Sequence, residues 1–536
     1  MAALQSQIDT GEESFVRNRN DMLRLIASYR AIEQRVATLS NARREQFESR
    51  GQLLPRQRLV HLIDRGSPFL ELSSLAGLGM HDDDGADNVM GGGAITGIGF
   101  VSGVRCMIVA HDSAIKGGII TPLGLKKQLR AQDIAAENKL PVIYLVESGG
   151  GNLRLQAETF IDGGAMFKNQ SRLSAAGIPQ ISVVHGSSTA GGAYLPALSD
   201  YVIMVRNRAK IFLAGPPLLK AATGEVATDE DLGGADMHSS VSGVADYTAE
   251  DDLEALSLAR RIVKALNWSG SAPVSSFREP RYPPEELAGI VPIDFRKSYD
   301  VREVITRLVD DSDFLEFKHA YGFATVCGQS EIHGHPVAFI ANNGPIDPDG
   351  ASKAGQFIQL MCQAGTPIVY LQNITGYLVG TDAERRGIVK HGAKMIQAVS
   401  NATVPQITLH IGASFGAGNF GMCGRAFDPR FIFAWPNNRV AVMGGEQAAQ
   451  VMTIIAEERQ KKLGKVFDRA AAKATERQLI EQFEKESTAL FATARLWDDG
   501  IIDPRDSRNV LAFCLATCRE AQSRNLNANT FGVARL

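Results

Sequence analysis

The sequence has few cysteines and no long uninterrupted apolar run, so it lacks the signals of a disulfide framework and of a membrane span. It has six cysteines in 536 residues, and no two of them form a CxxC pair. Buried thiols in a reducing compartment are the simplest interpretation of that pattern. No apolar run is long enough to cross a bilayer, and the acidic segment MAALQSQIDTGEE lacks the apolar core of a signal peptide. We expect a cytoplasmic protein with no metal site and no membrane partner.

An excess of charge of one sign is also missing. The formal net charge is −3, so nothing points to nucleic acid as a partner. Hydrophobic residues make up 44% and charged residues 21% of the chain, as in globular proteins. A chain of this length normally divides into two domains. Glycine, by contrast, is abundant, and its 52 residues gather in turns where the backbone can approach a ligand closely.

The second half of the chain repeats the first at a constant interval. LPVIYLVESGG, with Pro141, recurs as TPIVYLQNITG, with Pro367, and IPQISVV recurs as VPQITLH at the same interval. STAGGAYLPALSD then aligns with the segment around GASFGAGN, so that Ala190 corresponds to Gly416 and Gly191 to Ala417. Shared order and shared spacing indicate an internal duplication of a large domain rather than a solenoid of short repeats.

Each copy has the same order of elements. In the first copy a β-rich stretch at 94–112 precedes a helical pattern at 125–139 and a short apolar strand at 141–147. A glycine turn, another helix and a second apolar strand at 179–185 follow. Short strands that are apolar throughout and alternate with helices are buried on both faces, which is typical of an α/β fold.

Three segments are expected along the chain. Residues 1–50 are charged, with apolar positions at helical spacing, and predict an N-terminal helical extension. Residues 51–280 and 290–536 would be the N-terminal and C-terminal domains. The stretch between them is rich in proline and serine, as linkers are.

The glycine turns offer backbone chemistry in place of side-chain chemistry. After a strand, small residues let a ligand come close to main-chain N–H groups, and the first N–H groups of the next helix are unpaired. Two such groups aimed at one oxygen form an oxyanion hole. A single turn of this kind is more often a packing device, but here two stand at matching positions, and a further turn with Gly149 and Gly150 ends a neighbouring strand. The pattern favours a reaction that passes through an oxyanion, such as a thioester enolate.

Four long stretches carry a resemblance to a known family. They are KGGIITPLGLKKQLRAQDIAAENKLPVIYLVESGGGNL, GIPQISVVHGSSTAGGAYLPALSDYVIMV, GASFGAGNFGMCGRAFDPRFIFAWPNNRVAVMGGEQAA and LWDDGIIDP. They resemble the carboxyltransferase (β) subunit of the biotin-dependent acyl-CoA carboxylases, along nearly the whole chain. GASFGAGN and MGGEQAA resemble the 3-methylcrotonyl-CoA and geranyl-CoA branch rather than the propionyl-CoA branch. The resemblance implies an α/β fold of duplicated crotonase-like ββα-spiral domains.

The resemblance also implies a division of labour between the two copies. The N-terminal copy would bind acyl-CoA, with the N–H groups of Ala190 and Gly191 on the thioester oxygen. The C-terminal copy would bind biotin, with the N–H groups of Gly416 and Ala417 on the ureido oxygen, and the active site would lie between domains of different subunits. The biotin nitrogen would act as the base. No ATP-binding loop and no biotin attachment site stand in the sequence, so a separate α subunit is expected to supply biotin carboxylase and carrier around a β6 core, as α6β6.

Further residues are candidates for substrate binding. They are Gly149, Gly150, Gly192, Lys116 and Lys353, together with the pair Gly163 and Gly164. Lys116, Lys126, Lys127 and Arg130 would meet CoA phosphates, although helix-surface lysines are more often only solvated. Relatives that act on 3-methylcrotonyl-CoA have phenylalanine where this chain has Gly163. The missing ring would leave room for a longer chain, so geranyl-CoA is the expected substrate, unless the paired glycines only form a flexible turn.

Other functions remain open at this point. The main alternative is the β subunit of 3-methylcrotonyl-CoA carboxylase. A decarboxylase or transcarboxylase subunit would use the same two oxyanion holes in reverse. A non-catalytic assembly scaffold is a third possibility, although a dead site would not need to keep small residues at both turns. His185 and His410 lie near equivalent strand ends, where histidine is more often a packing residue than a catalyst.

Overall fold

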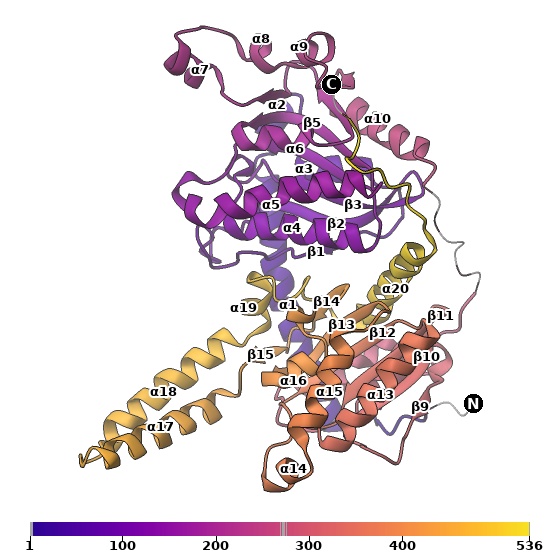
Figure 1. Ribbon diagram of the computed structural model, residues 1–536, viewed down its shortest axis with the longest axis vertical. Coiled ribbons are helices and arrows are strands. Elements are labelled where there is room, and N and C mark those ends of the chain that lie inside the picture. The colour runs from indigo at the N-terminus through magenta and orange to yellow at the C-terminus, as the bar shows by residue number, and fades with distance from the viewer. Residues whose placement is uncertain (1–3, 269, 271–273, 275, 535–536) are drawn as a thin grey trace. The chain divides into compact units, whose positions relative to one another are not determined.

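The computed structural model describes residues 4–268, 270, 274 and 276–534, which form two compact units (Figure 1). The N-terminal unit comprises residues 30–272, 494–496 and 517–536, and the C-terminal unit comprises residues 1–29, 273–493 and 497–516. The helices α1 (Glu13–Asn41) and α20 (Ser507–Ser523) contribute residues to both units. The domains predicted from the sequence are continuous segments, whereas each of these units combines several segments of the chain. A helix of 29 residues is about 43 Å long, so its apolar residues extend beyond a single core.

An eight-stranded sheet forms the centre of the N-terminal unit. Its order is β1-β2-β3-β4-β5-β6-β8, and β7 pairs with β5. The first three strands are antiparallel neighbours, and the strands from β3 onward run parallel. Their bounds are β1 (Leu70–Leu72), β2 (Ala94–Val101), β3 (Val104–His111), β4 (Val142–Ser148), β5 (Gln180–Thr189), β6 (Tyr201–Val205), β7 (Lys210–Phe212) and β8 (Tyr247–Ala249).

Helices cover this sheet. Leu59 of α3 and Leu256 of α10 join the buried strand residues Ile143, Ile181 and Ile203 in one apolar core. The helices of the unit are α2 (Arg44–Ser49), α3 (Pro55–Leu62), α4 (Pro122–Glu137), α5 (Gln156–Ala175), α6 (Tyr194–Ala197), α7 (Pro216–Thr223), α8 (Asp229–Gly233), α9 (Ala235–Ser240) and α10 (Asp252–Ala265). The expected strands and the helix after the β-hairpin are thus present, as the apolar and helical patterns indicated.

A seven-stranded sheet forms the centre of the C-terminal unit. Its order is β14-β13-β12-β11-β10-β9, and β15 pairs with β13. The strands are β9 (Leu315–Phe317), β10 (Thr325–Ile332), β11 (His335–Asn342), β12 (Ile368–Ile374), β13 (Gln406–Phe415), β14 (Phe431–Ala434) and β15 (Arg439–Ala441). The helices are α11 (Leu287–Ile290), α12 (Arg302–Leu308), α13 (Pro348–Ala364), α14 (Thr381–Arg385), α15 (Ile388–Ser400), α16 (Gly416–Gly421), α17 (Gly445–Lys462), α18 (Arg469–Glu486) and α19 (Ala489–Ala494). In Figure 1, α17 and α18 form a long helical hairpin.

Strands β1–β7 and β9–β15 follow the same plan, with β8 as an addition to the N-terminal sheet, and this agreement confirms the duplication. Strands β4 and β12, and strands β5 and β13, begin and end at the same interval that relates Pro141 to Pro367. The hairpins β2–β3 and β10–β11 are slightly further apart, because the connection from hairpin to helix is longer in the N-terminal copy, at 112–121 against 343–347. This longer connection carries Lys116, one of the candidate site residues.

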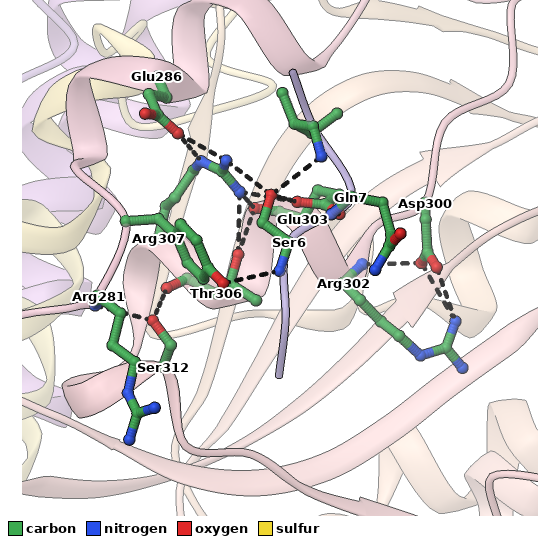
Figure 2. Close-up of polar contacts among 12 residues, drawn as sticks. Ser6, Gln7, Arg281, Glu286, Asp300, Arg302, Glu303, Thr306, Arg307 and Ser312 are labelled. Atoms are coloured by element: carbon green, nitrogen blue, oxygen red, sulfur yellow. Dashed lines mark hydrogen bonds and ion pairs between the residues drawn. The ribbon is translucent and has the colours of Figure 1, made fainter. Parts of the chain in front are cut away.

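A short N-terminal segment is tied to the C-terminal unit (Figure 2). The Ser6 hydroxyl donates to Glu303, and the Gln7 N–H donates to the other carboxylate oxygen at 2.7 Å. Glu303 is also paired with Arg307 at 2.9 Å, and Arg307 is in turn paired with Glu286 at 2.6 Å. Because the Arg307 side chain is almost fully buried, these two carboxylates are needed to neutralise it.

Two absences apply to the described residues. None of their helices is both long enough and apolar enough to span a membrane. None of the six cysteines, all of which lie in the described part of the chain, forms a disulfide, and all except Cys362 are buried.

Candidate active site

The two glycine turns of the N-terminal unit start from paired residues. Ser148 at the end of β4 is aligned with Ser188 near the end of β5, so both turns leave the same edge of the sheet. The Ile120 N–H donates to the Gly150 carbonyl at 3.0 Å, and the Gly149 N–H donates to the Gly117 carbonyl at 3.0 Å. The residues after β3 therefore hold the Gly149–Gly150 turn in place. The edge is the one at which parallel sheets bind ligands.

The turn after β5 has a strained backbone. Ala190 has a φ of 54°, the left-handed conformation that L-residues other than glycine adopt at a cost of about 1–2 kcal/mol. A 3-10 turn follows at Ala190–Ala193, and the Ser188 hydroxyl donates to the Gly192 carbonyl at 2.9 Å. A Cβ added at Gly191 would meet nothing within 4 Å in its own chain. Packing within the chain therefore does not explain why this residue is a glycine.

The turn after β13 repeats this conformation. Gly416 has a φ of 55°, and the residue before it, Phe415, is extended, as is its counterpart Thr189. Here the Ser414 hydroxyl donates to a side-chain oxygen of Gln372, and Asn419 donates to Ser414 at 2.7 Å. The same backbone shape is thus fixed by two different sets of hydrogen bonds.

The helices after both turns are short. The first turn continues into a 3-10 turn and the four-residue helix α6, and the second into the six-residue helix α16. Short helices have little macrodipole. Any anion binding at these turns therefore depends on individual backbone N–H groups rather than on a helix dipole.

The second turn opens onto a cavity of about 400 Å³ within the C-terminal unit. Its lining residues are His410, Ser414, Gly416, Ala417, Asn419, Phe420, Arg425, Ala426, Val440, Ala441, Val442 and Trp497. The lining combines an apolar majority with a few polar groups, and both features are typical of small-molecule sites. We refer to this cavity as the Gly416 cavity.

A second cavity, of about 380 Å³, lies beside the Gly149 turn in the N-terminal unit, and we refer to it as the Gly149 cavity. Lys116 and Gly149 both line it, so the structure brings two predicted site residues together. Arg43 and Arg50, from the predicted helical extension, add two cations that sequence reasoning missed. A cluster of three basic side chains with a glycine turn can bind a phosphorylated ligand.

A buried ionic network lies beneath this cavity. Glu147 accepts from Arg58 at 2.5 Å and from Ser113 at 2.8 Å. Arg58 also pairs with Asp252, which accepts from His185 Nδ1 at 2.8 Å. Burial opposes ionisation of Glu147, but the charge of Arg58 outweighs it and lowers the pKa of that carboxyl. His185 is therefore held by structural partners, which agrees with the expectation that it is not the catalyst.

Two of the candidate lysines are buried and bonded to the backbone. Lys127 and Lys353 occupy matching positions in the two copies. The Lys127 amine donates to the carbonyls of Gly91 and Ala94 at 2.9 and 2.6 Å, and the Lys353 amine donates to the Tyr321 carbonyl at 3.0 Å. Each amine thus binds backbone carbonyls at the approach to the β-hairpin of its own unit. The expectation that Lys127 meets CoA phosphates is therefore wrong.

The other candidate cations differ in exposure. Lys353 does not line the Gly416 cavity, and its role in substrate binding stays a prediction. Arg130 is buried, whereas Lys126 is exposed. The Lys116 amine donates to the Asp82 carbonyl at 2.9 Å and remains exposed, so it is a lysine with access to a ligand.

The glycine pair Gly163 and Gly164 lies inside α5 and does not form a turn. Phe167, one helical turn after Gly163, packs edge-on against Tyr194 at 5.7 Å between ring centroids. Gln170, on the same helix, donates to the Leu195 carbonyl at 3.0 Å. Because residues four apart share a helix face, Gly163 is on the side of α5 that faces the segment after Ala190. A Cβ at either glycine would meet nothing within 4 Å.

The described residues contain no cluster of three or more histidine, cysteine, aspartate or glutamate side chains suited to a metal ion. The residues that the structure brings together at the two sheet edges are instead backbone turns, hydroxyls and a few cations. Arg43 and Arg50 lie far from Gly149 in the sequence and near it in the fold, so no local pattern could have pointed to them.

Comparisons with known proteins agree with this arrangement. The family described as the carboxyl transferase domain matches residues 46–533. A probable methylcrotonoyl-CoA carboxylase beta chain of Drosophila melanogaster is 49% identical over 99% of this chain and 95% of its own length. A probable biotin-dependent acyl-coenzyme A carboxylase beta2 subunit of Mycobacterium tuberculosis is 51% identical over 92% of both chains.

A solved structure is similar over the full length. The beta subunit of geranyl-CoA carboxylase from P. aeruginosa superposes with a TM-score of 0.94 and is 54% identical, covering 100% of both chains. The likeness confirms the expected crotonase-like fold class, with two sheets rich in parallel strands.

Proposed function

The chain belongs to the carboxyl transferase family and is the carboxyltransferase β subunit of a biotin-dependent acyl-CoA carboxylase, and we propose that its substrate is geranyl-CoA. In this proposal the carboxyl group moves from carboxybiotin, carried on a separate α subunit, to the γ-carbon of the branched enoyl-CoA. The β subunit of 3-methylcrotonyl-CoA carboxylase is the alternative, since relatives of that name are about as similar.

The matching backbone of the two turns is the observation that carries the mechanism. Ala190 and Gly416 have φ values of 54° and 55°, so each turn presents its N–H groups in the same way. Ala190 and Gly191 would bind the thioester oxygen, and Gly416 and Ala417 would bind the ureido oxygen of biotin. A strained alanine at the first turn is kept because the shape is needed there.

The two turns would stabilise negative charge where it develops. Loss of the γ-proton places charge on the thioester oxygen, and donors fixed at that oxygen lower the barrier more than they strengthen binding. Bound carboxybiotin would supply the carboxyl group and, through its ureido nitrogen, the base. The backbone N–H groups of this chain would bind the two oxygens and orient the thioester. The small residues at the turns would leave room for the two ligands.

The acyl pocket is proposed to extend along α5. The contact of Phe167 with Tyr194 fixes this helix beside the Ala190 turn, so a side chain at Gly163 would project toward a bound acyl group. Two glycines within a helix cost about 1 kcal/mol each relative to alanine. Nothing in the chain fills the space above them, which favours a ligand as the reason. The Gly149 cavity, with Lys116, Arg43 and Arg50, would take the phosphates of CoA.

Partners and location are further parts of the proposal. We expect the α subunit to carry both biotin and the ATP-dependent carboxylation, with six copies of this chain as the core of an α6β6 complex in the cytoplasm. A decarboxylase or transcarboxylase subunit would need the same turns, and a scaffold would not. The mass of the purified complex tests the stoichiometry, and a biotin signal on this chain in a streptavidin blot would contradict the division of labour.

Substitution of Gly163 tests the choice of substrate. Gly163→Phe should raise the KM for geranyl-CoA by more than tenfold, because each of several displaced methylenes is worth about 0.8 kcal/mol. The KM for 3-methylcrotonyl-CoA should change little. The matched control is Lys168→Phe, which adds a ring at an exposed position on another side of the same helix. If wild-type enzyme does not use geranyl-CoA, or both substrates respond alike, the substrate is 3-methylcrotonyl-CoA.

A further inference from the structure

His410 lines the Gly416 cavity and has an unused hydrogen-bonding atom. Its side chain is 2% exposed, and its Nε2 has no hydrogen-bond partner among the described residues. A buried donor or acceptor without a partner costs about 1–3 kcal/mol, so native structures rarely keep one unless something else supplies the partner. The equivalent strand position in the N-terminal copy holds Val184, which is fully buried. The fold therefore does not need a polar residue at this position.

The state of the imidazole follows from its neighbours. Asn438 Nδ2 lies 3.4 Å from His410 Nδ1, and an amide nitrogen can only donate. Nδ1 is then the acceptor, so a neutral ring carries its proton on Nε2. Burial lowers the pKa of His410 to about 4, which keeps the ring neutral at physiological pH. The unused atom is thus a hydrogen-bond donor.

The rest of the lining shows what kind of group could accept. Ser414 and Asn419 already bond each other, and Arg425 is paired with Asp499 at 3.0 Å. The partner that is missing is an acceptor oxygen on a ligand close to Gly416 and Ala417, which line the same cavity. This step rests on the proposed function, in which the biotin group occupies that cavity.

We infer that His410 is a ligand-binding residue of the biotin site, and that its Nε2–H donates to an oxygen of the ureido or carboxyl group held at the Gly416 turn. It adds a side-chain donor to the two backbone donors of that turn. The N-terminal copy, with valine at the same position, binds its thioester without such a group. The histidine therefore distinguishes the biotin side from the acyl side of the duplication.

Free biotin is the probe for a binding test that does not depend on turnover. Trp497 lines the same cavity, so its fluorescence should report binding to the purified full chain, and Trp497→Phe should remove that signal. His410→Val, the residue that the other copy uses, should weaken biotin binding by about 5- to 20-fold. His410→Gln retains an N–H donor and should restore part of the affinity. Unfolding midpoints of all variants should match that of the wild type.

Kinetics of the reverse reaction give the second measurement. Transfer from the carboxylated acyl-CoA product to free biotin should show a raised KM for biotin in His410→Val, with an unchanged KM for the acyl-CoA. The inference is overturned if wild type is active and His410→Val binds biotin normally, or if Gln gives no rescue. If wild type binds acyl-CoA but transfers no carboxyl group to biotin, the proposed function itself has failed.

Discussion

The two copies of the repeat agree in backbone and differ in how the last helix of each is attached. In the N-terminal unit, Asp252 opens α10 and accepts hydrogen bonds from Leu53, Arg58 and His185. In the C-terminal unit, Ser507 opens α20 and accepts a hydrogen bond from Trp435 Nε1 at 2.9 Å. The first residue of the last helix is thus a buried carboxylate in one unit and a neutral hydroxyl in the other. The start of the last helix is therefore fixed by a different first residue in each unit.

The largest expected effect separates these two attachments. Asp252→Asn should lower the free energy of unfolding by about 3–5 kcal/mol, because the buried cation Arg58 keeps only Glu147 as a counter-charge and His185 loses its anionic partner. Chemical denaturation monitored by circular dichroism measures the loss.

The same variant has a defined pH dependence. Burial opposes ionisation of Asp252, but the hydrogen bond from His185 and the charge of Arg58 lower the pKa of that carboxyl well below its usual range. A lowered folded pKa gives stability that is present above the unfolded pKa of about 3.9 and is lost as the pH falls below it. The difference between wild type and variant should shrink below about pH 4. A difference that grows in acid would contradict the network.

The two glycine turns give the next largest effect. Gly191→Val should lower the rate with acyl-CoA by about 10²–10³-fold, and Ala417→Val should lower the rate with biotin by a similar factor, because a bulky side chain keeps the oxygen away from the N–H groups. Kinetic constants for both substrates, measured for each variant, assign each turn to one substrate. A Cβ at Gly191 meets nothing in its own chain, so the protein should remain folded.

Ala27→Val on the exposed face of α1 is the matched control, since it makes the same exchange as Ala417→Val away from both turns. A turn whose variant has unaltered rates with both substrates has only a structural role. Variants that each impair both substrates equally would contradict the division of labour between the two copies.

The sequence predicts those parts of the molecule that depend on local pattern. Apolar strands and glycine turns have strong local signals, and the interval that relates Pro141 to Pro367 aligns the strands of the two sheets from the sequence alone. The turns at Ala190 and Gly416 are found in this way. Their left-handed φ, however, is a property of the folded turn, and nothing in the alanine itself indicates it.

Burial and long-range contacts could not be predicted in the same way. Lys127 and Lys126 are neighbours on one helix, yet one is buried and bonded to carbonyls and the other is exposed. Arg43 reaches the cavity beside Gly149 from a much earlier part of the chain. Gly163 lies within α5 rather than in a flexible turn, because the helix-breaking tendency of glycine is weak beside tertiary packing.

The paired lysines provide a smaller effect. Lys127→Met should lower the free energy of unfolding by about 1–3 kcal/mol, since the carbonyls of Gly91 and Ala94 lose their donor. Burial lowers the pKa of Lys127 to about 8, below the unfolded value of about 10.4. The unfolded chain then binds more protons between these values, so the wild type should gain stability relative to the variant from about pH 8 to about pH 10.

Urea denaturation at pH 7 and pH 9.5 measures both effects. Lys126→Met, on the exposed neighbour, should change neither the midpoint nor its pH dependence. If Lys127→Met is as stable as wild type at both pH values, the hydrogen bonds of the Lys127 amine do not stabilise the fold.

The smallest effect returns to the start of the last helix. Ser507→Ala should cost about 1 kcal/mol, because the fully buried Trp435 loses one neutral hydrogen bond and no charge is left uncompensated. Neither side chain ionises between pH 5 and pH 9, so the loss should be constant over that range, in contrast to the acid dependence expected for Asp252→Asn. Ser507→Thr retains the hydroxyl and serves as the control. If the free energy of unfolding falls as much as in Asp252→Asn, the hydroxyl of Ser507 contributes more than one neutral hydrogen bond. The proposed difference between the two helix attachments would then be wrong.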